Sequence, residues 1–171
     1  MISGKMAKAI NRQINRELYS AYLYAGMAAH AASIGLKGFE NWFLIQVEEE
    51  TAHARRMYDY LNQNGAKVVL DSIETPPQEY SSPIDLFEKT LEHEKRVTKM
   101  INGLVILAGE EGDKNTENFL RWYVKEQMEE EEHAGGAIGK IKESIKKNDE
   151  KKGIVDIDAY FLKRKFTPPE D

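Results

Sequence analysis

The chain has 171 residues, of which 41% are hydrophobic, so it is long enough for one domain with a sizeable core. Its 24 Lys and Arg against 29 Asp and Glu argue against nucleic acid and anionic membranes as partners. Cys is absent, which excludes disulfides, thiolate zinc sites and cysteine nucleophiles. Because no apolar run is long enough to cross a bilayer and residues 1–12 lack a secretory core segment, we expect a cytoplasmic protein.

The N-terminal part of the chain predicts two helices joined by a short connection. Residues 5–33 contain no Pro, and their apolar side chains recur at helical spacing, with Glu17 falling inside the apolar face. A second helix is predicted over residues 38–64, followed by Gly65 as its C-terminal cap. The short connection implies that the two helices are antiparallel neighbours.

A long non-helical segment follows the second predicted helix. Residues 66–83 contain three Pro, and they are too many for a simple turn, so we expect a crossover along the length of a bundle. Ser82 followed by Pro83 is typical of an N-cap with Pro at the first helical position. A third helix is therefore predicted from Pro83 to about Ala108.

The C-terminal part predicts a fourth helix over residues 114–147, a short fifth helix over residues 154–163 and an irregular tail over residues 165–171. The whole pattern predicts a single all-α domain spanning residues 1–171. Its four-helix bundle covers about residues 5–147, with the long crossover between helices 2 and 3 and the short fifth helix at the C-terminus.

One carboxylate interrupts the apolar face of each long helix. Each of the four lies near the middle of its helix, and mid-helix inward positions of a four-helix bundle meet at one level. His53 lies three residues after the carboxylate of the second helix, and this Glu-x-x-His spacing is typical of carboxylate-bridged di-iron sites. The four carboxylates are Glu17, Glu50, Glu94 and Glu130.

These inward polar groups predict a metal site. Gln127 also points inward, and no Lys or Arg falls in the same helical faces. Repulsion and desolvation would force most of the carboxyls to bind protons unless cations were present, and two divalent metal ions resolve the conflict. Glu50 is placed to bridge them, and Glu130 is a second candidate for this role. Taken alone, each of Glu17, Glu94 and Glu130 fits a partly exposed position at a misplaced helix boundary better than a metal site. The coincidence of all four carboxylates favours the metal site.

Further residues lie beside the predicted site. Tyr24 follows Glu17 by two helical turns, which suits core packing or a hydrogen-bonding or redox neighbour of the metals. His133 is expected to be exposed or to lie behind the ligands. Three further carboxylates can form a weaker cation site toward one surface, and these are Glu49, Glu126 and Glu129.

At these motifs the chain resembles the non-haem ferritins of bacteria and archaea, over residues 10–166. The resemblance rests on residues 15–24, Glu49-Glu50 with His53, Glu92-His93-Glu94, residues 119–123, Glu126-Gln127 and Glu129-Glu130. It implies that Glu17, Glu50 and His53 ligate a first iron. It implies that Glu50, Glu94 and Glu130 ligate a second iron, with Gln127 beside the pair and Tyr24 nearby. It also implies a third iron position at Glu49, Glu126 and Glu129.

The resemblance further implies a homo-oligomeric hollow cage of 24 subunits, which oxidises Fe(II) with O2 or peroxide and stores ferric mineral. Bacterioferritins are less similar. They carry a second Glu-x-x-His where this chain has Gln127 to Glu130, and a haem-ligating Met where it has Thr51, so no haem is expected. His133 and the pair Gly135-Gly136 depart from the usual ferritin pattern, and close packing of a neighbouring backbone is one explanation for the two Gly.

Two other functions stay open at this point. The first is a di-iron peroxidase or oxygenase similar to the rubrerythrins, although the lack of Cys removes the electron-transfer iron site that such proteins usually carry. The second is a helical structural or interaction protein whose inward carboxylates pair with unseen partners.

Overall fold

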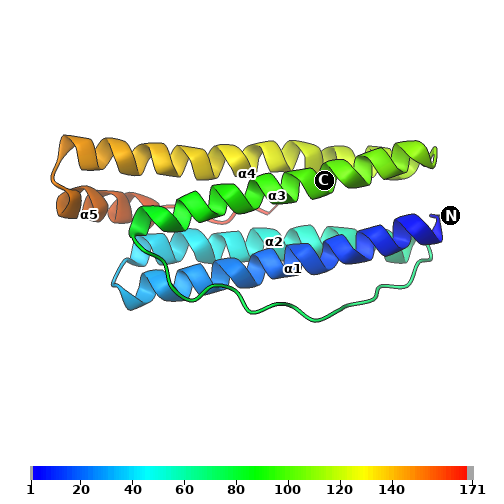
Figure 1. The fold of residues 1–171 in the computed structure, drawn as a ribbon, viewed down its shortest axis with the longest axis horizontal. Coiled ribbons are helices and arrows are strands. Elements are labelled where there is room, and N and C mark those ends of the chain that lie inside the picture. The colour runs from blue at the N-terminus through cyan, green and yellow to red at the C-terminus, as the bar shows by residue number, and fades with distance from the viewer. Residues whose placement is uncertain (1, 169–171) are drawn as a thin grey trace.

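The computed structural model describes residues 2–168, in which five helices and no strands occur. The four long helices lie side by side along one axis, and the short fifth helix packs at one end of the bundle (Figure 1). Helix α1 packs mainly against α2, α3 packs against α4, and α5 contacts both α4 and α2. This is the predicted all-α four-helix bundle. The helices are α1 (Gly4–Ser33), α2 (Lys37–Gln63), α3 (Pro83–Glu110), α4 (Lys114–Lys147) and α5 (Glu150–Phe161).

The first four helices begin and end within two residues of the predicted positions. The side chain of Ser82 accepts a hydrogen bond from the backbone N–H of Asp85, and Pro83 is the first residue of α3. Gly65 has a φ of +69°, the left-handed conformation expected of a residue that ends a helix. Local turn chemistry therefore sets these boundaries.

Residues 66–82 form the crossover and run along α1, from the end of α2 back to the start of α3 (Figure 1). Two side chains of α1 bind its backbone as a neighbouring strand would. The Asn11 amide donates to the carbonyl of Lys67 at 3.0 Å and accepts from the N–H of Val69 at 2.7 Å. Asn15 repeats the arrangement one turn later, with Ser72 and Asp71. These bonds satisfy four backbone groups of the crossover, which has no regular secondary structure.

The predicted bounds of the fifth helix are wrong. The helix begins at Glu150, four residues earlier than residue 154, because the Asp149 side chain accepts a hydrogen bond from the N–H of Lys152 and caps it. Gly153 then lies so close to α4 that an added Cβ would stand 2.8 Å from the Cα of Ile145. Residues 165–168 of the predicted tail form no helix or strand, and residues 169–171 lie outside the described residues.

The N-terminus of α2 is held by α5. The backbone N–H groups of Gly38 and Phe39 both donate to Oδ1 of Asp158, at 2.7 and 3.0 Å. A Cβ added to Gly38 would overlap the backbone carbonyl of Asp158. Two rigid backbones meet at this point, so the contact cannot be relieved by rotating a side chain.

Gly38→Ala should therefore lower the free energy of unfolding by about 1–3 kcal/mol, because α5 must shift away from α2. Thermal or denaturant unfolding followed by circular dichroism measures this. The matched control is Gly139→Ala, since Gly139 is exposed in the C-terminal third of α4, with no atom of a neighbouring element within 4 Å of an added Cβ. That change should stabilise the helix by about 1 kcal/mol. A loss of stability in both variants, or in neither, would contradict the close contact.

The pair Gly135-Gly136 in α4 is not explained by packing within the chain. No atom of the described residues lies within 4 Å of a Cβ added at either position, apart from the helix's own backbone and chain neighbours. The explanation by close approach of another backbone therefore fails for this subunit. Nothing in the structure accounts for the two Gly.

Two apolar clusters fill the bundle and leave a polar level between them. The cluster at the α5 end contains Phe39, Phe43 and Phe87 together with residues of α5. The cluster at the opposite end contains Ile14 and Leu120. Within residues 2–168, no helix is long and apolar enough to cross a membrane.

Candidate metal centre

A layer of buried polar side chains separates the two apolar clusters, and every long helix contributes to it. Because the four helices pack with their middles at one level, residues far apart in sequence meet there. Seven of its side chains are each 2% exposed or less: Glu17 from α1, Gln46, Glu50 and His53 from α2, Glu94 from α3, and Gln127 and Glu130 from α4. The structure thus buries all six residues predicted for the two-metal site, which are those listed here apart from Gln46.

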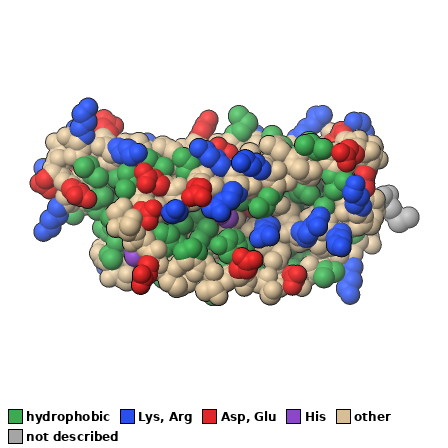
Figure 2. All heavy atoms as spheres, in the orientation of Figure 1, with side chains coloured by type: hydrophobic (Ala, Val, Ile, Leu, Met, Phe, Trp, Pro, Cys, Tyr) green, Lys and Arg blue, Asp and Glu red, His purple; other side chains and the backbone are tan. Residues whose placement is uncertain are grey.

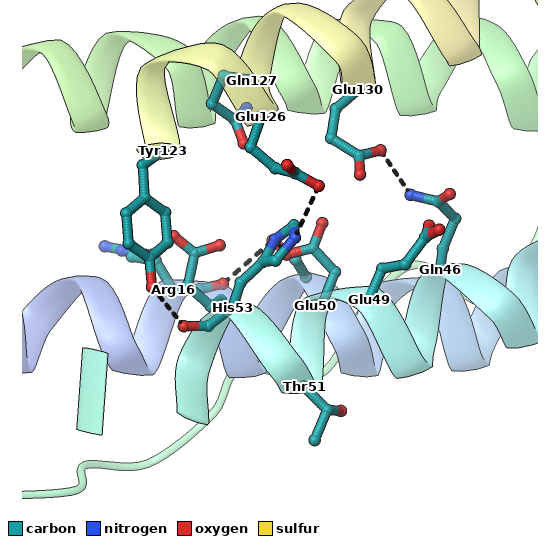
Figure 3. Close-up of polar contacts among 12 residues, drawn as sticks. Arg16, Gln46, Glu49, Glu50, Thr51, His53, Tyr123, Glu126, Gln127 and Glu130 are labelled. Carbon is teal, nitrogen blue, oxygen red and sulfur yellow. Dashed lines mark hydrogen bonds and ion pairs between the residues drawn. The ribbon is translucent and has the colours of Figure 1, made fainter. Parts of the chain in front are cut away.

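The imidazole of His53 lies at the middle of this layer, between carboxylates of two helices (Figure 3). Its Nδ1 is 3.4 Å from Oε2 of Glu50, and its Nε2 is 3.5 Å from Oε1 of Glu126. Two groups of three residues bring one ligand atom each within 4.8 Å of one another. One group is Glu17, Glu50 and His53, and the other is His53, Glu126 and Glu130.

Several of these buried atoms have no hydrogen-bond partner among the described residues. They are Oε2 of Glu17, Oε2 of Glu50 and Nε2 of His53. Oε2 of Glu50 and Nε2 of His53 make only the ion-pair contacts given above, at 3.4 and 3.5 Å. An unsatisfied buried polar atom is costly, so the layer needs bound cations, protons or water to complete these contacts. Hard oxygen donors with one imidazole suit a divalent ion such as Fe(II). The donor set therefore fits a metal centre.

Glu94 is held by hydrogen bonds from two sides. The hydroxyl of Tyr24 donates to Oε1 of Glu94, and Nε2 of Gln127 donates to Oε2 at 3.1 Å. Tyr24 is completely buried, so the structure favours the hydrogen-bonding role over simple packing for this residue. Burial raises the pKa of Glu94 to about 7, although both hydrogen bonds oppose the shift.

Two other carboxyls of the layer, those of Glu50 and Glu130, also resist ionisation. Burial raises the pKa of Glu130 to about 8, and the charge of Glu94 adds to the effect. Burial also raises the pKa of Glu50 well above its ordinary value. For His53, burial alone would lower the pKa, but Glu50 and Glu126 together raise it well above the ordinary value. Without a metal, the layer therefore retains protons near neutral pH.

The three residues predicted for a third iron position lie in different surroundings. Glu126 is beside His53, and this contact lowers the pKa of Glu126. The carboxylate of Glu49 is 2.9 Å from Nη2 of Arg164. Glu129 is 44% exposed and is 3.3 Å from Nζ of Lys125. Only the second of the two groups above contains Glu126, and neither group contains Glu49 or Glu129, so the third position stays a prediction.

Sequence reasoning missed three residues that hold the layer in place. Gln13 donates to Oε1 of Glu17 at 2.8 Å, and its position one helical turn before Glu17 could have revealed it. The Tyr123 hydroxyl donates to the backbone carbonyl of His53 at 2.7 Å. Arg164 follows α5 and carries no helical pattern, so no signal pointed to it. His133 is exposed, one of its two expected positions.

Comparisons with known proteins agree with this architecture. A family model described as the ferritin-like domain matches residues 7–144. The bacterial non-heme ferritin of Bacteroides fragilis is 41% identical over 142 residues, which cover 83% of this chain and 89% of that protein. The bacterial non-heme ferritin of Campylobacter jejuni is also 41% identical, with 83% and 85% covered.

Solved structures agree over nearly the whole chain. An open-pore ferritin from the hyperthermophilic archaeon Archaeoglobus fulgidus superposes with a TM-score of 0.92 at 46% identity, covering 96% of this chain and all of that one. A closed form of the same ferritin, engineered by mutagenesis, gives a TM-score of 0.93 at 46% identity and covers 98% of this chain. With the matching family model, these likenesses show that the chain belongs to the ferritin family.

Proposed function

We propose that this protein is an iron-storage ferritin with ferroxidase activity, which oxidises Fe(II) at a di-iron centre inside each subunit. The observation that carries the proposal is the buried layer with four carboxylates and one imidazole, several of whose donor atoms lack a hydrogen-bond partner in the described chain. Fe(II) is the substrate, and O2 or peroxide is the oxidant.

In this proposal Glu17, Glu50 and His53 hold one Fe(II), while Glu50, Glu94 and Glu130 hold the second. Carboxylates are hard anions that stabilise Fe(III) more than Fe(II), so they favour the loss of an electron from each ion. Two Fe(II) supply two electrons, which with two protons reduce O2 to hydrogen peroxide, or hydrogen peroxide to two water molecules.

Residues beside the proposed ligands orient them by hydrogen bonds. Tyr24 and Gln127 hold the Glu94 carboxylate by its two oxygens, and Gln13 holds one oxygen of Glu17. With a single imidazole among the ligands, the centre is expected to release its ferric product to a storage cavity instead of retaining it. No haem is expected to take part.

Storage requires many copies of the chain to enclose a cavity, and we propose a homo-oligomeric cage of 24 subunits. The crossover presents Val69, Leu70 and Ile73, each at least 40% exposed, and such apolar side chains suit contact with another copy. On the face shown in Figure 2, acidic and basic side chains are interspersed with hydrophobic ones. The location in the cytoplasm and the extent of one domain over residues 1–171 stay predictions.

Aerobic addition of Fe(II) to the metal-free protein tests the proposal. At two Fe(II) per chain we expect rapid ferric absorbance that saturates, and at large excess a slower, soluble mineral inside a particle of constant size. Absorbance and light scattering measure the two properties.

Other results would point elsewhere. Rapid oxidation by a small particle that precipitates iron at excess would retain the di-iron centre but reject storage, and would favour the peroxidase or oxygenase. No metal binding and no coloured product would favour the structural protein.

A further inference from the structure

Arg164 brings a positive charge to the edge of the polar layer from the segment after α5. Its Nη2 donates to Oε1 of Gln46 at 2.7 Å and lies 2.9 Å from Oε2 of Glu49. Its Nη1 donates to the carbonyl of Trp42 at 3.1 Å, and the guanidinium lies 4.5 Å from the centre of the Trp42 ring. Four contacts with α2 therefore fix the direction of this side chain.

The contact with Gln46 determines how the amide of Gln46 is turned. Guanidinium groups only donate hydrogen bonds, so the carbonyl oxygen of the amide must face Arg164. The amide nitrogen then faces the other way, where it donates to Oε2 of Glu130 at 2.8 Å. Gln46 is completely buried, and Figure 3 shows it reaching from α2 toward Glu130 on α4.

We propose that Arg164 is a positioning residue of the metal centre. Acting through Gln46, it holds Glu130 with one carboxylate oxygen engaged and the other free for a metal ion. The inference rests on the proposed function, because Glu130 is there a ligand of the second Fe(II). Without Arg164 the amide of Gln46 can turn over and place its oxygen against the carboxylate of Glu130. The two oxygens repel each other, so Glu130 loses the orientation that metal binding requires.

The role can be tested without displacing the C-terminal segment. The Asn41 side chain donates to the backbone carbonyls of both Phe161 and Arg164, each at 3.1 Å. Phe161 is buried in the apolar cluster at that end. The backbone is therefore held independently of the guanidinium, and Arg164→Met retains an alkyl chain to cover Trp42.

The experiment titrates Co2+ into the metal-free full-length protein, with calorimetry for the affinities and visible absorption for the coordination. The variants are Arg164→Met, Gln46→Leu and the double variant. Each single change should weaken one of the two Co2+ affinities by about tenfold, as loss of a group that orients a ligand does, and should alter the spectrum of that Co2+ only. The double variant should bind no more weakly than Gln46→Leu alone, because both residues act along one path.

Two further variants sharpen the result. Arg164→Lys should restore part of the affinity, since an ammonium can still donate to Gln46. Arg55→Met is the matched control, because Arg55 is an exposed residue of α2 paired with Asp59, and its loss removes the same charge. It should leave both affinities unchanged. Gln46→Met replaces Gln46→Leu if the latter does not assemble.

Several outcomes would overturn the inference. Unchanged Co2+ affinities in Arg164→Met would show that the orientation of Glu130 does not depend on the Arg164 guanidinium. Tighter binding in that variant would show that Arg164 competes with the metal, and losses that multiply in the double variant would show separate paths. If the unmodified protein binds two Co2+ in any of these cases, the proposed function survives alone. If it binds none, the proposed function and the inference both fall.

Discussion

Replacing Glu50 with Ala should abolish rapid iron oxidation while leaving the helices intact. Glu50 is the one carboxylate proposed as a ligand of both Fe(II), and it is buried beside His53 at 3.4 Å. Loss of a residue that only orients a ligand already costs about 10–100-fold, so removing a shared ligand should lower the initial rate by about 100-fold or more. Stopped-flow absorbance at two Fe(II) per chain measures the rate.

Glu48→Ala is the matched control for this change. Glu48 lies two residues earlier on α2 and is exposed, so its removal deletes the same charge without touching the polar layer. The rate should then match that of the unmodified protein, and circular dichroism should show unchanged helix content in both variants. An unaltered rate in Glu50→Ala would remove Glu50 from the centre.

The metal-free protein should become less stable as the pH rises from about 5 to about 9. Glu94 and Glu130 have pKa values of about 7 and about 8 in the folded protein, above the ordinary value of 4.5. The folded state therefore binds these protons more tightly than the unfolded chain. That stabilisation is complete below the ordinary value and is lost as the pH rises through 7 and 8, an effect on the order of several kcal/mol.

Melting temperatures of the metal-free protein at a series of pH values measure this loss. Glu130→Gln should flatten the dependence, because the amide cannot ionise, whereas the exposed Glu48→Gln should not change it. Co2+ should raise the melting temperature most at alkaline pH, since metal binding requires deprotonated carboxylates. A metal-free protein that gains stability between about pH 6 and about pH 9 would show that the layer is not protonated as described.

Helical periodicity was enough to predict the long helices and the residues that face inward. Glu17, Glu50, Glu94 and Glu130 were found because each breaks an apolar face of regular spacing, and all four are buried. Local chemistry located helix ends for a similar reason. Ser82 and Gly65 act within one turn of the chain, and such short-range effects can be read from neighbouring residues.

The short fifth helix shows where prediction from local sequence patterns becomes less accurate. Its start depends on the Asp149 cap and on the contact of Gly153 with Ile145 across a tight connection, and a helix of 12 residues offers little periodic pattern. The hydrogen-bond partners of the buried carboxylates could not be predicted from the sequence either. Tyr24 on α1 donates to Glu94 on α3, 70 residues later in the sequence, so the choice between packing and hydrogen bonding required the fold.

Arg164 is the clearest example of a residue whose role could not be predicted from the sequence. Periodicity and spacing describe residues that share one helix, and by this measure the inward faces hold no positive charge. The guanidinium comes from beyond α5, 118 residues from its partner Gln46, and only the packing of α5 against α2 carries it there. Residues within one helix are related by its repeat, so the sequence alone was enough to identify the proposed ligands. Contacts between distant segments depend on how the helices dock, so the tertiary structure decided what holds those ligands in place.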